Sequence, residues 1–541
     1  MSDDGRFTLK KLVSASLMKR LDADTMEKCH VPSMVLMERA AMAAAERILS
    51  VAEEFFSSAR GVKPRIVIVC GSGNNGDDGL AIARLLHLKG LEAAYYPAGD
   101  PAHHTEQTKE QLAIAAAYHV PLAKEDDIDT CSILVDALFG VGLSRPLEGS
   151  YFRLIQRMNM AKAYRIAVDL PSGIDASTGQ ILGIAFHADE TITFAYTKTG
   201  LLLSPGREYA GKVFTADVGI YDNRDLPDCH DESAFCQLDP AMSGGNSQVG
   251  LESWQEAWLL ETSDLALLNK RNPAGNKGSF GKVLVVAGQA GMCGAAYLCS
   301  SAVLRSGAGM VKILTVEENR IPLQCLLPEA ILDFSSEEKG FEAALAWCDV
   351  LVVGPGLGTG PSAGFKAGWF LAHAALEGKP LVLDADGLNL LAANPDWQAY
   401  LNGQTVLTPH MGEMQRLCKE SIEALKSDRP GFCLALARQT GAVCVLKDSS
   451  TVTADAQGRI FVYGAGNSGM ATAGSGDVLA GIIGGCIATT RQEKAVPMSL
   501  KAALGVFLHG SCGEKAARLH SEASITAGSL LETLCTRIYH E

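Results

Sequence analysis

The residues best suited to chemistry lie in a glycine-rich segment between Gly466 and Gly481, which holds five glycines and a single acid, Asp477. Glycines leave backbone N–H groups open to an anion, and the apolar, helix-compatible run that follows would aim the positive end of a helix dipole at the same point. Phosphate repels a carboxylate, so Asp477 is suited to accept a proton from a substrate hydroxyl. The alternative is a glycine-rich turn in which Asp477 only caps the helix.

A second glycine loop, residues 71–79, follows the apolar run at 65–70 and precedes a stretch with helical spacing. This order is typical of a Rossmann-like strand, loop and helix. The loop also carries two asparagines and two aspartates. A loop that binds only a pyrophosphate, through its backbone N–H groups, does not need this many side-chain oxygens. The composition therefore predicts a bound cation, or contacts with polar ring substituents, at this loop.

Two other acids of the first half, Asp136 and Asp169, stand at the ends of apolar runs. The carboxyl ends of parallel strands share one edge of a sheet, so the loop at 71–79 and both acids are expected at one site. The alternative is that Asp136 and Asp169 only cap turns or helices.

The elements that must position these residues are short β-branched runs that alternate with glycine loops and helical patterns. This alternation predicts parallel sheets covered by helices. The clearest runs are at 65–70, 133–136, 165–169 and 282–286. The pattern lapses between about 222 and 276, which places a domain boundary near residue 228. In the second half, apolar runs end in candidate ligand loops at 352–358, 382–387, 406–410 and 445–448.

Length and composition set the class of protein. The chain has 541 residues, more than one hydrophobic core usually serves, so two domains are expected. Its net charge of -14 argues against partners such as nucleic acid or a membrane surface, which need a basic face. The 15 cysteines form no Cys-x-x-Cys pair, which favours free thiols in a reducing compartment. No signal peptide or membrane span is recognisable, so a cytoplasmic protein is expected.

Five motifs together resemble those of the bifunctional NAD(P)H-hydrate repair enzymes, and the resemblance extends over nearly the whole chain. They are Asn74-Asn75-Gly76, the run from Asp169 through Pro171-Ser172-Gly173-Ile174-Asp175, Asn276-Lys277-Gly278, Thr408-Pro409-His410 with Gly412-Glu413, and Gly474-Ser475-Gly476-Asp477. The resemblance implies an α/β protein of two domains. Residues 1–228 would form a Rossmann-like epimerase domain, a three-layer structure around a parallel sheet, and residues 229–541 a ribokinase-like α/β domain, the ADP-dependent dehydratase.

The implied function is repair of reduced nicotinamide cofactors that have added water to a ring double bond. The first domain would interconvert the R and S forms of the hydrates NADHX and NADPHX. The second would dehydrate the S form to NADH or NADPH, while ADP is converted to AMP and phosphate. The implied cofactors are K⁺ in the epimerase domain and Mg²⁺ with ADP in the dehydratase domain.

In the epimerase domain the resemblance implies that Asp169 is the catalytic acid or base. Residues matching potassium ligands are Asn75, Asp136 and Ser172. Residues matching contacts to the hydrate are Asp169 together with Asn74, Asn75, Gly76, Asp77, Asp78, Gly140, Val141, Gly142, Leu143, Ser144, Arg145 and Pro146. Asp77 departs from the family, which has a glycine there. If that position needs a positive φ, the aspartate costs about 1 kcal/mol or more.

In the dehydratase domain the resemblance makes Asp477 the catalytic base and a contact of the hydrate. The other matching hydrate contacts are Ala295, Gly358 and His410. Residues matching nucleotide contacts are Lys447, Asp448, Ser449, Ser450, Thr451 and Gly476. Glu413 is expected to cap the following helix rather than to ligate magnesium. An exposed β-turn is the alternative for the stretch from Lys447 to Thr451.

Three points stay open at this level. Gly476-Asp477 alone fits a ribokinase-like small-molecule kinase with an N-terminal binding domain, although the fused first domain argues against it. A scaffold without catalysis is a second alternative, which the presence of Asn75, Asp136, Asp169 and Ser172 disfavours. A homo-oligomer is expected, and the apolar helix at 35–48 could supply its interface or could equally belong to an internal core.

Overall fold

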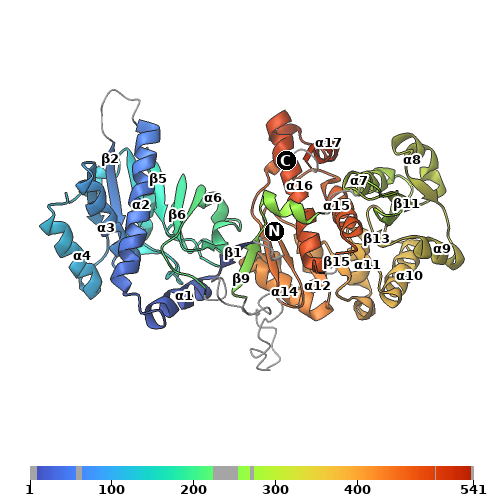
Figure 1. Ribbon diagram of the computed structural model, residues 1–541, viewed down its shortest axis with the longest axis horizontal. Helices are drawn as coiled ribbons and strands as arrows, with labels where there is room; N and C mark the ends of the chain where they lie inside the picture. Colours follow the sequence, from blue (N-terminus) through green and yellow to red (C-terminus); the bar gives the residue numbers. More distant parts are fainter. Residues whose placement is uncertain (1–8, 57–63, 223–253, 269–272, 494, 538–541) are drawn as a thin grey trace. The chain divides into compact units, whose positions relative to one another are not determined.

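The computed structural model describes residues 9–56, 64–222, 254–268, 273–493 and 495–537 (Figure 1). The chain divides into two compact units, and the first begins at Lys11. The predicted boundary near residue 228 lies outside the described residues, so it stays a prediction. Each unit is built around its own sheet, as the alternation of strands and helices in the sequence predicts.

The first unit contains a six-stranded parallel sheet in the order β3-β2-β4-β5-β6-β8. The strands are β2 (Arg65–Cys70), β3 (Glu92–Pro97), β4 (Ile133–Ala137), β5 (Tyr164–Val168), β6 (Glu190–Phe194) and β8 (Lys212–Ala216). A short pair, β1 (Lys10–Val13) and β7 (Thr197–Lys198), is also parallel. In register, Val69 of β2 lies beside Asp136 of β4, which lies beside Ala167 of β5.

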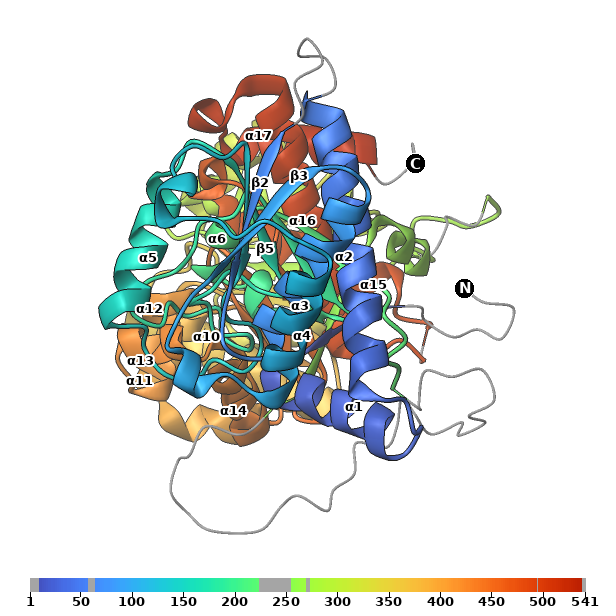
Figure 2. The same ribbon diagram turned by 90° about the vertical axis from the view of Figure 1, so that its left-hand side faces the viewer.

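Helices cover both faces of this sheet, as the two views show (Figures 1 and 2). Ile66 and Ile68 of β2 join one apolar core, whereas Val67 and Val69 join another. The alternation is expected for a strand that is buried on both sides. The helices are α1 (Ala15–Glu27), α2 (Ser33–Phe56), α3 (Asn74–Leu88), α4 (Glu106–Ala117), α5 (Gly149–Met160) and α6 (Gly206–Ala210). The predicted three-layer, Rossmann-like arrangement is confirmed.

The helix α2 contains the apolar stretch that left two alternatives open. Leu36, Ala40, Ala44 and Ile48 are each at most 6% exposed and pack in the core of the first unit. Their spacing places them on one helix face. This face serves the internal core, and the expected homo-oligomer stays a prediction.

The second unit contains a mixed sheet in the order β12-β11-β10-β13-β14-β15-β16-β17-β18-β9. The strands from β12 to β16 in this order are parallel, whereas β17 is antiparallel to both its neighbours. Their bounds are β9 (Glu256–Leu259), β10 (Lys282–Val286), β11 (Met310–Leu314), β12 (Ile331–Asp333), β13 (Val350–Val353), β14 (Leu381–Leu383), β15 (Thr405–Leu407), β16 (Val443–Leu446), β17 (Thr451–Ala454) and β18 (Ile460–Tyr463).

The helix α15 (Ser475–Thr489) lies at the centre of the second unit and packs against α7 (Cys293–Arg305) and α16 (Met498–His520). It is buried on all sides from Val478 to Ala488. Its glycines allow close packing: a Cβ at Gly481 would lie 2.1 Å from the backbone oxygen of Cys299. The remaining helices are α8 (Arg320–Leu326), α9 (Glu338–Trp347), α10 (Pro361–Glu377), α11 (Asp386–Ala393), α12 (Met411–Cys418), α13 (Ile422–Ser427), α14 (Arg429–Thr440) and α17 (Ala527–Arg537).

Two sequence expectations concern the chain as a whole. Every cysteine within the described ranges is a free thiol, as the scattered spacing predicts. In the same ranges, no helix combines the length and the apolar composition that crossing a bilayer requires.

Candidate active sites

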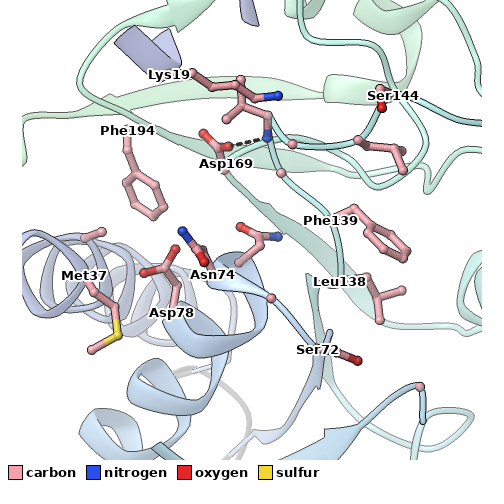
Figure 3. Close-up of a pocket in the computed structure, with 18 of the residues that line it drawn as sticks. Lys19, Met37, Ser72, Asn74, Asp78, Leu138, Phe139, Ser144, Asp169 and Phe194 are labelled. Atoms are coloured by element: carbon pink, nitrogen blue, oxygen red, sulfur yellow. Dashed lines mark hydrogen bonds between the residues drawn. The ribbon is translucent and has the colours of Figure 1, made fainter. Parts of the chain in front are cut away.

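The first unit contains a cavity of about 1620 Å³ at the carboxyl ends of its strands. Its walls come from α1, the start of α3, the loop after β4 and the residues after β5 (Figure 3). Most of the predicted hydrate contacts line it: Asn74, Asn75, Asp78, Asp169 and Gly140 to Pro146. The structure therefore brings the three predicted strand ends together at one site.

Gly76 and Asp77 do not line the cavity, although both were predicted to contact the hydrate. The helix α3 begins at Asn74, so residues 74, 75 and 78 share one face and residue 77 points the other way. Gly76 is needed for a different reason, since a Cβ there would lie 1.9 Å from the backbone oxygen of Gly71.

Asp77 is fully buried behind the glycine loop. It has no positive φ, so the strain considered for an aspartate at this position does not arise. Neither carboxyl oxygen meets a hydrogen-bond donor at normal geometry. Burial raises the pKa of Asp77, and the nearby Thr108 hydroxyl, which donates to the backbone oxygen of Ser72 at 3.3 Å, still lowers this pKa in part. A buried carboxyl group without a normal hydrogen bond costs stability at this position.

Asp169 follows β5 with a φ of 66°, a left-handed conformation that non-glycine residues adopt mainly at turns and functional sites. Its Oδ2 accepts the backbone N–H of Val141 at 3.0 Å, and its Oδ1 accepts the ammonium of Lys198 at 2.6 Å. Lys198 is 1% exposed and also donates to Thr193 Oγ1 and to the backbone oxygen of Phe194. Asp169 is therefore more than a turn cap: it forms a buried ion pair at the cavity.

Sequence reasoning missed Lys198 and Asp22, which also line this cavity. Burial raises the pKa of Asp22, and the charge of Asp169 adds to the effect. Burial also raises the pKa of Asp78 well above its usual range, together with the charges of Asp169, Asp77 and Asp22. A lone lysine inside the apolar stretch around residues 192–203 is the signal that could have pointed to Lys198.

Asp136 and Ser172 meet beside the cavity. Ser172 donates to Asp136 through its hydroxyl at 2.7 Å and its backbone N–H at 2.8 Å, and burial raises the pKa of Asp136 to about 6. Asn75 has a buried side-chain nitrogen with no hydrogen-bond partner. The Asp136 carboxylate, the Ser172 hydroxyl and the side-chain oxygen of Asn75 form a hard-oxygen donor set that suits an alkali cation. The unpartnered Asn75 nitrogen is a hydrogen-bond donor, so it is not a ligand of such a cation.

In the second unit, Asp477 occupies the first turn of α15. Gly474 caps the helix with a φ of 87°, a left-handed conformation that favours glycine. The alternative in which Asp477 caps the helix is wrong, because the cap residue is Gly474. Burial and the negative charges of Asp384 and Asp386 raise the pKa of Asp477 to about 6, and Lys447 opposes them. The structure thus places an accessible proton acceptor beside a set of backbone N–H groups.

The strand ends next to Asp477 carry the other polar groups. Lys447 donates to Asp384 Oδ1 at 2.7 Å, and its ammonium lies 3.5 Å from the point that a Cβ on Gly476 would occupy. The backbone N–H of Gly358 donates to Asp386 at 2.8 Å. Between the two acids, Ala385 has a φ of 50°, an uncommon backbone conformation at a site of this kind. Sequence reasoning named the loop at 382–387 but assigned no role to Asp384 or Asp386.

His410 is in register with Lys447 through an isolated parallel bridge. Its Nδ1 accepts the backbone N–H of Gly412 at 3.0 Å, and the Glu413 carboxylate accepts the N–H of His410 at 2.8 Å. This is a reciprocal capping box at the start of α12, so the predicted capping role of Glu413 is confirmed. The His410 side chain stays 55% exposed and is open to a ligand.

The predicted nucleotide contacts lie on and after the connection from β16 to β17. Asp448 accepts two hydrogen bonds from buried Arg429, at 2.8 and 2.9 Å, which fix the start of this turn. Ser450 is buried, and Thr451 opens β17. Ala295 is buried in α7, close to Gly356. A Mg²⁺ ion that is bound to a nucleotide usually takes one or two carboxylate ligands from the protein. Asp384 and Asp386 are the carboxylates of this site that suit this role.

Comparisons with known proteins match both units. A family model described as YjeF-related protein N-terminus matches residues 33–200, and one described as NAD(P)H-hydrate dehydratase matches residues 283–536. The bifunctional NAD(P)H-hydrate repair enzyme Nnr of Thermofilum pendens is 33% identical, over 97% of this chain and 95% of that protein. The chain belongs to this family.

Another NAD(P)H-hydrate repair enzyme agrees with this assignment, and two solved structures show a partial similarity. The bifunctional repair enzyme of Escherichia coli is 32% identical over 90% of this chain and 88% of its own length. An ADP/ATP-dependent NAD(P)H-hydrate dehydratase from Bacillus subtilis, crystallised with ATP and Mg²⁺, is 27% identical with a TM-score of 0.43. It covers 52% of this chain and 96% of that structure. A ribokinase-like superfamily protein from Enterococcus faecalis is 27% identical with a TM-score of 0.46, over 52% and 94% of the two chains. The predicted α/β fold in two units is confirmed by the sheets and helices of the chain itself.

Proposed function

We propose that this protein is a bifunctional nicotinamide-cofactor repair enzyme. Its first unit epimerises the R and S forms of NADHX and NADPHX, and its second unit dehydrates the S form at the expense of ADP. The observation that carries the proposal is the presence of two separate carboxylate centres at strand ends, Asp169 beside Lys198 and Asp477 beside the Lys447–Asp384 pair. Membership of the repair family supports both halves of the proposal.

In the second unit, the difficulty of the reaction is that hydroxide leaves poorly. Asp477 takes the proton of the substrate hydroxyl, whose oxygen attacks the terminal phosphoryl group of ADP, and AMP departs. The phosphorylated oxygen then leaves as phosphate, and loss of a ring proton restores the double bond. The N–H groups of Gly474 and Gly476 stabilise the transferring group. Mg²⁺, held by the nucleotide with Asp384 or Asp386, neutralises phosphate charge when bound.

The remaining predicted ligands of the second unit position the two substrates. The nucleotide binds on one side of Gly476, where it contacts Lys447, Asp448, Ser449, Ser450 and Thr451. An ion pair with Arg429 holds Asp448 in place. The hydrate side is formed by Ala295, Gly358 and His410. This division puts the reacting hydroxyl between Asp477 and the phosphoryl group.

In the first unit, the hydrated carbon bears both a hydroxyl and the ring nitrogen, so it behaves as a hemiaminal. Asp169 acts as an acid or base in the inversion of this carbon, and the loop from Gly140 to Pro146 encloses the ring. Asn75, Asp136 and Ser172 hold K⁺, which supplies positive charge beside Asp136 and orders this loop when bound. The protein is proposed to be a cytoplasmic homo-oligomer.

Recovery of reduced-nicotinamide absorbance from mixed R and S NADHX tests the proposal. The reaction contains Mg²⁺ and K⁺ with ADP, ATP or no nucleotide. Complete recovery that requires ADP is the expected result, and replacement of K⁺ by Na⁺ should slow only the phase that consumes the R form. A halt with the R form left over would refute the epimerase half. Recovery of nothing, with a stable phosphorylated product, would instead favour a ribokinase-like kinase.

A further inference from the structure

We propose that Asp78 is the proton donor of the epimerisation and that it works across the substrate ring from Asp169. The assignment rests on the epimerase function proposed above for the first unit. It adds a second catalytic carboxyl group and a specific route for inversion, in which water leaves one face of the ring and enters from the other.

The placement of the two carboxyl groups carries the inference. Asp78 projects from the first turns of α3, on the helix side of the cavity, and Asp169 stands at the end of β5, on the sheet side. Figure 3 shows both side chains at the same hollow, with Asn74 beside Asp78. A planar ring that lies between α3 and the sheet edge therefore has one carboxyl group on each face.

The two groups differ in their charged neighbours. Asp169 accepts a hydrogen bond from the buried ammonium of Lys198 at 2.6 Å. Burial raises the pKa of Asp78, and the charges of Asp169, Asp77 and Asp22 add to this rise. The positive charge of Lys198 opposes this rise in the pKa of Asp78. A pair of carboxyl groups whose surroundings push their proton affinities apart is the arrangement that divides acid from base in other enzymes.

The chemistry balances with these two groups alone. The Asp78 carboxylic acid gives its proton to the substrate hydroxyl as the carbon–oxygen bond breaks, and the lone pair of the ring nitrogen forms a carbon–nitrogen double bond. Water leaves on the Asp78 side. A second water adds to the same carbon on the Asp169 side, and Asp169 accepts its proton. The carbon has inverted, one solvent oxygen has replaced the original one, and the proton has moved from Asp78 to Asp169. Proton exchange with water in the cavity restores the Asp78 acid and the Asp169 carboxylate before the next turnover in the same direction. The reverse reaction exchanges the roles.

Oxygen exchange tests this route directly. The full-length protein is incubated with S-NADHX in ¹⁸O-labelled water with K⁺ and without nucleotide, so that the second unit is idle. The epimers are then separated and weighed by mass spectrometry. At early times each R molecule should carry one ¹⁸O, whereas the remaining S form should carry none beyond the enzyme-free control.

The other outcomes separate this assignment from the function on which it rests. R-NADHX that forms at the enzymatic rate with its original oxygen would indicate ring opening at the carbon–nitrogen bond, and would overturn the assignment while leaving the epimerase intact. No inversion above the enzyme-free rate would overturn the epimerase function and the assignment together.

Variants identify the donor. Asp78→Asn should lower the epimerisation kcat about 100-fold, the usual scale for loss of a general acid, with a small change in KM. Dehydration of S-NADHX by the same protein reports that the chain is folded. Asp22→Asn removes a neighbouring carboxyl group of the same cavity and should lose less than about tenfold. Asp24→Asn, a solvent-facing change on the same helix as Asp22, is the matched control. A loss for Asp22→Asn equal to that for Asp78→Asn would show that Asp78 is not the donor.

Discussion

The two units place a lysine–aspartate ion pair at the carboxyl end of a parallel sheet, but they use it differently. In the first unit Lys198 pairs with Asp169, the carboxylate that faces the substrate, at 2.6 Å. In the second unit Lys447 pairs with Asp384 at 2.7 Å, and Asp477 is left beside that pair with its pKa raised to about 6. In the first unit the lysine is thus bonded to the proposed proton acceptor itself. In the second unit the ion pair lies beside the proton acceptor and acts on its pKa through charge.

This difference follows from the two reactions. A base that must deprotonate a hydroxyl gains driving force from a raised proton affinity, provided that it is still ionised near neutral pH. Asp477 meets both conditions. In the first unit, Lys198 donates directly to Asp169, the carboxyl group that is proposed to exchange a proton with water.

The largest expected effect comes from removing each carboxylate in turn. Asp477→Asn should lower dehydration at least about 1000-fold, because loss of a positioned base typically costs two to four orders of magnitude, and should spare epimerisation. Asp169→Asn should do the reverse. Rates of both reactions on the same preparations provide the measurement. Near-normal dehydration by Asp477→Asn would show that the base is elsewhere.

A backbone change should separate the stabilities of the units. Gly76→Ala puts a Cβ 1.9 Å from the backbone oxygen of Gly71, so α3 must shift and the first unit should lose about 2–3 kcal/mol, the cost of overpacking. Gly73→Ala is the matched control, since a Cβ there meets nothing within 4 Å. Denaturant unfolding, followed by circular dichroism, measures both. Equal losses for the two variants would contradict the close packing of this loop.

A pair of charge changes tests the tuning of Asp477. Dehydration should fall as the pH drops through about 6, because Asp477 acts as a base only when ionised. Lys447→Met removes the charge that lowers the pKa of Asp477, so the acid limb should move to higher pH. Asp384→Asn removes a charge that raises it, so the limb should move to lower pH. Shifts of about one pH unit, or tenfold in rate at pH 6, are expected. The pH dependence of kcat decides, and shifts in the same direction would refute the tuning.

The smallest expected effect concerns Asp77. Its buried carboxyl group has no hydrogen-bond partner, and removal of such a group should stabilise the first unit by about 1 kcal/mol. Asp77→Ala should therefore raise the melting temperature of that unit by a few degrees. Asp126→Ala, at an exposed acid that pairs with Arg157, controls for the lost charge. A lower melting temperature for Asp77→Ala would reveal a partner for this carboxyl group.

The sequence predicts much of the fold because several strands, among them β2, β5, β13 and β14, are short apolar runs with a glycine or an acid directly after them. Asp169 could be identified from such a position, and Asp477 from the glycine-rich segment that precedes a helix. The ion pairs could not, because Lys198 joins Asp169 across 29 residues and Lys447 joins Asp384 across 63, and only the strand order brings them together. Asp77 was misplaced for a local reason: the helix begins within the glycine loop, where successive side chains point about 100° apart, so Asp77 leaves the face that carries Asn75 and Asp78.

Complementation between two variants tests the central claim most directly. Pure R-NADHX is offered with ADP, Mg²⁺ and K⁺ to Asp169→Asn, to Asp477→Asn and to an equal mixture of both proteins, and reduced-nicotinamide absorbance is followed. Neither variant alone should restore absorbance above the enzyme-free rate of epimerisation, and the mixture should restore it completely. Full recovery with either variant alone, or none with the mixture, would contradict a division of labour between the two carboxylates.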